Sequence, residues 1–197
     1  NIWMFMGIYL FSNILWLFGI NGSSIVFPIV FALCISNTGI NAELVNAGKE
    51  PTALINLQMF RYVLIGGAGN TLGLVLLMCK SKSKHIRSIG RLSVLPGICG
   101  INEPVVFGLP LVLNPIFAIP FILNSVIAAF IAVVATNIGF LTCGVLDCPP
   151  GLPVFVTGFI SYGIHGIIVQ AIILIVTFII WVPFVLMSNK QDKLEQK

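Results

Sequence analysis

Long apolar stretches with almost no charge inside them dominate this sequence of 197 residues. Charged residues make up 8% of the chain, whereas a soluble domain needs about a quarter of its residues charged to cover its surface. Several of the apolar stretches approach the ~20 residues that a helix needs to cross ~30 Å of hydrocarbon. We therefore expect an all-α integral membrane protein.

Most of the basic residues are gathered in two places, a central run and the tail. They are Lys80, Lys82, Lys84, Arg87 and Arg91, followed by Lys190, Lys193 and Lys197. A basic run is compatible with nucleic acid or with an anionic lipid patch, but between apolar segments it more often marks a cytoplasmic loop. We expect a cytoplasmic loop at 80–91, a soluble cytoplasmic tail at 188–197, and no nucleic-acid partner.

The cysteines and histidines give no sign of a metal site or of a self-contained enzyme. The five cysteines lack metal-ligand spacing supported by further Cys or His, so we expect neither a metal nor a cofactor. Cys143 and Cys148 share one loop, and a disulfide between them is an alternative if that loop faces an oxidising exterior. His85 lies in the basic run, and His165 lies among glycines, where packing is a commoner role than catalysis.

The first part of the chain alternates long and short apolar segments. Residues 2–20 are long enough to span, whereas 25–35 is short and interrupted by Pro28, as in a broken or re-entrant helix. We expect 36–52 to form an interfacial or aqueous connection. Apolar character returns over 57–79, where a cluster of glycines predicts close helix packing, with close approach to a ligand as the alternative.

The second part of the chain contains a segment that no lipid-facing helix would tolerate. Residues 92–115 are apolar yet contain four prolines and three glycines, and proline inside a helix removes a hydrogen bond and clashes with the preceding turn. Such backbone survives at membrane depth only when protein or a water-filled cavity surrounds it, which predicts a re-entrant helical hairpin. We expect spans at 116–140 and within 154–187, and a loop or second broken element at 141–153.

Glu103 is the candidate that the hairpin singles out. It lies at the break, between Asn102 and Pro104, and an ionisable group within a membrane usually faces a cavity, a partner or a substrate path. The structural alternatives are a carboxylate that caps freed N–H groups, or one that pairs with Arg61. Asn21-Gly22 lies at an earlier break, where a simple tight turn is the plainer interpretation.

The segment I-N-E-P-V-V-F-G-L-P-L-V-L-N-P, residues 101–115, resembles the membrane IIC component of the lactose/cellobiose (diacetylchitobiose) family of the phosphoenolpyruvate-dependent phosphotransferase system. The resemblance includes 82–123, extends upstream through 65–73 and 18–22, and continues downstream from Gly158-Phe159 to the final span. It implies transmembrane helices with re-entrant helical hairpins, in the bacterial cell membrane.

The resemblance also implies a function and its residues. Residues 1–187 correspond to the C-terminal transport part of such a permease, with the N-terminal half and its dimer contact absent. A β-disaccharide of the cellobiose, lactose or chitobiose type would bind in a cavity and be phosphorylated by a cytoplasmic IIB protein carrying a phosphocysteine. Glu103 would contact the accepting hydroxyl as the catalytic residue, and Asn21, Gly22 and Asn102 would complete the substrate site.

Two departures from the family pattern leave an alternative open. The family usually has F-G-I-H-G where this chain has Phe18 to Gly22, so Asn21 replaces a histidine that can take a proton. Before Gly158 the family often has a tryptophan followed by threonines, and this chain has Pro150-Gly151-Leu152. A truncated or degenerate relative that does not transport is the alternative. An ion-coupled carrier is disfavoured, because no relay of buried acids accompanies Glu103.

Overall fold

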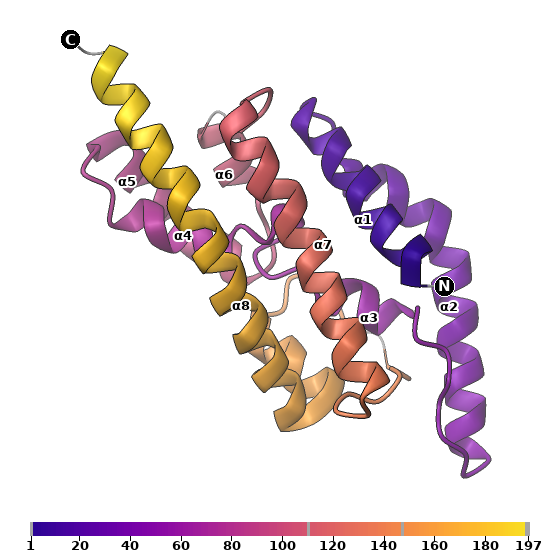
Figure 1. The fold of residues 1–197 in the computed structure, drawn as a ribbon. Helices are drawn as coiled ribbons and strands as arrows, with labels where there is room; N and C mark the ends of the chain where they lie inside the picture. Colours follow the sequence, from indigo (N-terminus) through magenta and orange to yellow (C-terminus); the bar gives the residue numbers. More distant parts are fainter. Residues whose placement is uncertain (1, 110, 147, 196–197) are drawn as a thin grey trace.

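The computed structural model describes residues 2–109, 111–146 and 148–195, and within those ranges it contains helices and connections but no strand (Figure 1). The helices are α1 (Ile2–Leu17), α2 (Gly22–Asn46), α3 (Leu57–Tyr62), the 3₁₀ turn η1 (Ala68–Asn70), α4 (Leu72–Cys79), α5 (Lys84–Ile98), α6 (Glu103–Gly108), α7 (Pro115–Asn137) and α8 (Val154–Glu195). The prediction of an all-α fold is confirmed.

Three helices are long and apolar enough to cross a membrane, namely α2, α7 and residues 154–188 of α8. Helix α7 packs against both α1 and α8 and carries a buried seam of small residues, including Ala128, Ala129 and Ala132 (Figure 1). Small side chains let helices approach closely when the surrounding solvent is lipid. The helix Pro115–Asn137 agrees with the span predicted at 116–140 almost to its ends.

Helix α2 is continuous to Asn46, which corrects the prediction of a broken element at 25–35 and shortens the connection predicted over 36–52 to 47–52. Asn21 caps it, since the Asn21 Oδ1 accepts a hydrogen bond of 3.0 Å from the Ser24 backbone N–H. Pro28 removes a single N–H near the start of the helix without ending it. The sequence prediction gave this proline too much weight.

Two asparagine side chains of α2 bind the segment that follows the helix. Asn37 Nδ2 donates to the Ile55 carbonyl at 2.7 Å. Asn41 is fully buried, donates to the Ala53 carbonyl and accepts from the Ala53 N–H, both at 2.8 Å. These amides bind the extended segment that follows the helix, so their polarity serves the backbone of 53–55 rather than water.

The predicted basic loop at 80–91 is largely helix α5, which corrects that prediction. The helix begins at Lys84, and the Ser83 hydroxyl accepts from the Ile86 N–H as its cap. One face carries the buried residues Gly90, Ser93 and Gly97 against the rest of the protein. Lys84, Arg87 and Arg91 therefore belong to an amphipathic helix, whose outer face tolerates charge, whereas Lys80 and Lys82 lie before it.

The predicted hairpin is confirmed at its break, since α5 ends at Ile98 and α6 begins at Glu103. A second break separates α3 from α4, and the two tips meet. A Cβ atom built on Gly67 would lie 2.9 Å from the Gly100 carbonyl oxygen and 3.0 Å from Asn102. Gly67 has φ +83°, so glycine is required there both by conformation and by space.

Helix α8 contains a kink at Tyr162 and Gly163, where the backbone leaves helical geometry. The arm before the kink folds against the arm after it, and a Cβ atom on Gly166 would lie 2.1 Å from the Gly158 carbonyl oxygen. Residues 141–146 and 148–153 form a connection without helix. The helix continues to Glu195, beyond the point at which the sequence predicted a tail.

Gly22 lies where α1 and α2 touch, and this contact generates a prediction. A Cβ atom at Gly22 would lie 1.9 Å from the Ser12 carbonyl oxygen, whereas one at Gly39, on the same helix, would meet nothing within 4 Å. We expect Gly22→Ala to destabilise the protein by about 1–3 kcal/mol through overpacking. Gly39→Ala should be neutral or slightly stabilising.

Thermal unfolding of the detergent-purified chain measures both variants. The expected result is a lower midpoint for Gly22→Ala alone. Equal midpoints for the two variants would show that α1 and α2 do not cross at this glycine.

Candidate functional site

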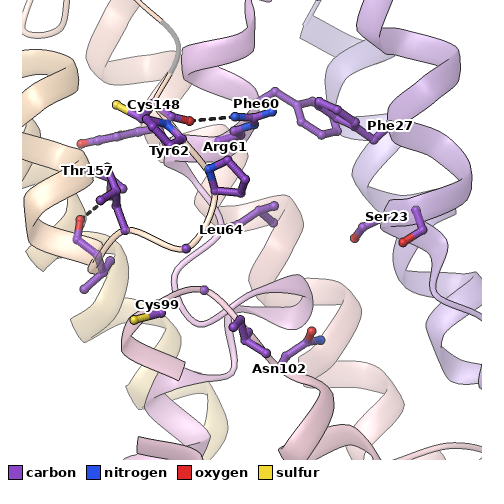
Figure 2. Close-up of a pocket in the computed structure, with 18 of the residues that line it drawn as sticks. Ser23, Phe27, Phe60, Arg61, Tyr62, Leu64, Cys99, Asn102, Cys148 and Thr157 are labelled. Carbon is purple, nitrogen blue, oxygen red and sulfur yellow. Dashed lines mark hydrogen bonds between the residues drawn. The ribbon is translucent and has the colours of Figure 1, made fainter. Parts of the chain in front are cut away.

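A cavity of about 880 Å³ opens between the hairpin tip before α6, helices α1 to α3 and the connection that leads into α8 (Figure 2). Its lining includes the aromatic residues Trp16, Phe27, Phe60 and Tyr62 and a smaller number of polar side chains. Aromatic walls with a few placed polar groups are typical of sites for small organic ligands.

Three of the four residues predicted for the site line this cavity. Asn21, Asn102 and Glu103 all belong to its wall. Asn21 Nδ2 donates to Glu103 Oε1 across 3.4 Å, which joins residues 82 positions apart in the sequence. Glu103 is half-buried and occupies the first turn of α6, where the helix dipole favours a negative charge.

Asn21 has two roles, one for the oxygen and one for the nitrogen of its side-chain amide. The Oδ1 atom caps α2 through the Ser24 N–H, and the Nδ2 atom faces Glu103. The cap fixes the amide in the orientation that presents its donor to the carboxylate. One side chain therefore both caps the start of α2 and contacts the carboxylate in the cavity wall.

Asn102 is almost fully buried beneath the cavity surface, at 3% exposure, and holds the two hairpin tips together. Its Nδ2 donates to the Ala68 carbonyl at 3.1 Å. This bond crosses from the break before α6 to the turn η1, so Asn102 sets the position of its neighbour Glu103.

Gly22 is outside the cavity lining that the described residues form, because its backbone packs on Ser12 of α1. Its contribution to the site is indirect, since it lets α2 begin close to α1 and so places Asn21.

Arg61 forms a basic part of the wall, and Figure 2 shows it across the hollow from Asn102. Its Nη1 donates to the Cys148 carbonyl at 2.7 Å, and its guanidinium carbon lies 5.3 Å from the centre of the Phe27 ring. A guanidinium held by a carbonyl and an aromatic face is oriented before any ligand arrives. The contacts described for Arg61 thus tie α2 and α3 to the connection before α8.

Gln58 is a lining residue that the sequence analysis missed. It is buried, its Nε2 donates to the Ser161 carbonyl, and its Oε1 accepts from the Leu146 N–H at 3.0 Å. The signal in the sequence was a neutral glutamine three residues before Arg61, within an apolar stretch. Gln58 and Arg61 together fix the loop that forms one wall.

Pro28 also contributes to the site in a way that the sequence analysis did not anticipate. A proline has no N–H, so the Ser24 carbonyl lacks the helical donor that would otherwise reach it. Both residues line the cavity. The proline therefore removes one helical hydrogen bond of α2 at the cavity wall.

Neither histidine lines this cavity in the described part of the chain. His165 is exposed, and its ring meets Phe140 edge-on with 4.8 Å between the centroids. His85 is exposed on α5. The five cysteines are free thiols, and two of them, Cys99 and Cys148, line the cavity from different segments.

The arrangement suits a neutral, hydroxyl-rich ligand. The carboxylate of Glu103 accepts hydrogen bonds and can take a proton from a hydroxyl group, whereas the amide of Asn21 both donates and accepts but cannot take a proton. The aromatic walls supply apolar surface for the faces of a ring.

Comparisons with known proteins agree with this geometry. Residues 1–125 match the family described as "Phosphotransferase system, EIIC". The chain is 32% identical to the cellobiose-specific EIIC component of Lactococcus lactis subsp. lactis (strain IL1403), over 99% of this chain and 44% of the relative. It is 34% identical to the lichenan permease IIC component of Bacillus subtilis (strain 168), over 93% and 42% respectively.

A solved structure has the same fold across the whole chain. It is the transporter ChbC, the IIC component of an N,N'-diacetylchitobiose-specific phosphotransferase system, with a TM-score of 0.93 and 31% identity. The superposition covers 100% of this chain and 46% of ChbC. This chain therefore spans less than half the length of the relatives named here, and like them it is an integral membrane protein. The chain belongs to the EIIC family of the phosphotransferase system.

Proposed function

We propose that the chain is the sugar-translocating part of a phosphotransferase permease, which binds a β-linked disaccharide for phosphorylation by a IIB protein. The observation that carries the proposal is the Asn21–Glu103 contact at the break of a re-entrant hairpin, inside a cavity with aromatic walls. The relatives' printed substrates, which include cellobiose, lichenan and N,N'-diacetylchitobiose, support a β-linked sugar.

The chemistry proposed for Glu103 is contact with the sugar hydroxyl that accepts the phosphoryl group. The hydroxyl oxygen attacks phosphorus, the bond from phosphorus to the cysteine sulfur of the partner breaks, and the hydroxyl proton passes toward the carboxylate. Phosphoryl transfer depends mainly on positioning and charge stabilisation, so an oriented carboxylate suffices in principle without a histidine. Asn102 positions this carboxylate, and Asn21 binds beside it.

The partners proposed for the whole permease follow the same reasoning. A lactose-specific relative from Streptococcus mutans serotype c (strain ATCC 700610 / UA159) is named an EIICB component, 35% identical over 92% of this chain. That name supports transfer from a IIB unit, either fused or separate. We place residues 1–187 in the C-terminal transport part of the permease and 188–197 in the cytoplasm. We further propose a homodimer in the lipid bilayer, built through the other half of the permease.

Asn21 supports a second candidate, a membrane relative that does not transport. An amide at this position cannot share a proton with Glu103, and relatives more than twice as long contribute further chain to a complete permease. The two candidates differ in whether any sugar phosphate forms.

Replacement of the carboxylate tests the proposed chemistry. We expect Glu103→Gln to lower sugar phosphorylation by about a hundredfold or more, because the amide cannot accept the hydroxyl proton. The chain is reconstituted with a polypeptide that supplies the remaining length of a IIC component and with phosphorylated IIB. Sugar phosphate is then measured over a panel of β-linked disaccharides.

Glu50→Gln is the matched control for this experiment, since Glu50 is exposed and lies outside the cavity lining. It should leave product formation unchanged. Absence of product from every sugar in the unsubstituted protein, with the helical fold intact, would favour the non-transporting candidate.

The two roles of Asn21 can be separated by two substitutions. Asn21→Ser keeps a side-chain oxygen for the helix cap but replaces the amide donor that faces Glu103 with a hydroxyl on a shorter side chain, so we expect about tenfold slower phosphorylation with an unchanged unfolding midpoint. Asn21→His introduces a group able to share the proton, and we expect phosphorylation about tenfold faster than with Asn21. It should also cost about 1 kcal/mol of stability through the weaker cap. Equal phosphorylation rates for the unsubstituted protein and the two variants would show that Asn21 takes no part in the reaction.

A further inference from the structure

The outward face of α5 changes character along its length. Lys84, Ser88, Arg91, Leu92 and Leu95 recur at the spacing of one helix face, and all are exposed. Leu92 and Leu95 are 76% and 72% exposed, among the most exposed large apolar side chains. The face therefore begins with cations and ends with leucines along about 16 Å of helix.

The basic end of this face is held in an ordered turn. Arg87 Nε donates to the Ser81 carbonyl at 2.8 Å, and its Nη2 donates to the Lys82 carbonyl at 3.3 Å. The exposed side chains of Lys80 and Lys82 thus project from a turn that is bonded to α5 itself. Their charges are gathered before a ligand binds, which lowers the entropy lost on binding.

The chain segment that carries these cations contains no acidic residue. The sequence has neither aspartate nor glutamate between Glu50 and Glu103. On its inner side α5 lies close to α4, since a Cβ atom on Gly90 would lie 2.8 Å from the Cys79 nitrogen. The orientation of α5 is therefore set by packing, and the graded face is left outward.

We propose that this graded face binds an anionic phospholipid, with its phosphate at Lys80, Lys82 and Lys84 and its acyl chains along Leu92 and Leu95. A phospholipid combines negative charge and hydrocarbon in the order that the face presents them. Juxtamembrane lysines attract anionic headgroups, and leucines about two to three turns further along the helix gain from contact with hydrocarbon. Nucleic acid has no counterpart for the leucines. This proposal depends on the membrane fold and is independent of sugar transport.

The test compares lipid retention by the full chain. The protein is reconstituted in vesicles of phosphatidylcholine with phosphatidylglycerol, re-extracted in mild detergent, and the co-purified lipids are quantified by mass spectrometry. We expect phosphatidylglycerol to be enriched over phosphatidylcholine, and the enrichment to fall as salt is added. The triple variant Lys80→Gln, Lys82→Gln, Lys84→Gln should lower the enrichment by about tenfold.

The matched control removes the same charge from the tail, by Lys190→Gln, Lys193→Gln and Lys197→Gln, and should change the enrichment by less than about twofold. An equal loss in both triple variants would overturn the proposal, because any lysines would then suffice. An unchanged enrichment in the α5 variant would also overturn it, and weaker binding of that variant to a IIB protein would identify an acidic protein face as the occupant.

A second pair of substitutions tests the apolar end. The double variant Leu92→Asn, Leu95→Asn should retain less total lipid. Its ratio of phosphatidylglycerol to phosphatidylcholine should stay above that of the triple variant at Lys80, Lys82 and Lys84. Retention equal to that of the unsubstituted protein would exclude the leucines from the site.

Discussion

The meeting of two helix breaks inside the protein is the constraint on which the rest of the structure depends. Backbone N–H and C=O groups freed within a membrane must find partners in the protein. The Asn70 side chain accepts from the Ile65 N–H at 2.8 Å, Ser125 accepts from the Gly69 N–H at 3.0 Å, and Asn102 donates to the Ala68 carbonyl. With these bonds made, non-helical backbone is stable at the floor of a cavity. Glu103 is the next residue after Asn102, so the bond that fixes Asn102 also sets the position of Glu103.

The features that the sequence predicted correctly are those whose cause is local. The high density of prolines and glycines between 92 and 115 disfavours one continuous helix, so the hairpin and its break at Glu103 could be inferred without any partner. The span α7 could be predicted for the same reason, because apolar length alone decides it. The nearness of Asn21 to Glu103 was implied by family resemblance and appears in the structure as a 3.4 Å contact.

The features that the sequence analysis predicted wrongly or missed depend on partners distant in the chain. The place of Asn41 within α2 depends on the backbone of Ala53, which bonds with both the oxygen and the nitrogen of its amide. The basic residues of α5 looked like a loop because the small residues of its inner face carry no hydrophobic signal. Gln58 has no local feature that marks it, since its role depends on Ser161 and Leu146.

The cavity wall beyond α7 bears on where a functional boundary can be drawn in this chain. The family match ends at residue 125, yet Cys148, Leu152 and Ser161 line the cavity, and Arg61 is bonded to the first of them. A domain boundary placed at residue 125 would keep Glu103 but exclude the part of the cavity wall formed by Cys148, Leu152 and Ser161. One part of the cavity wall thus lies outside the segment that matches the family model, so ligand preference can change through that part while the match to the family stays recognisable.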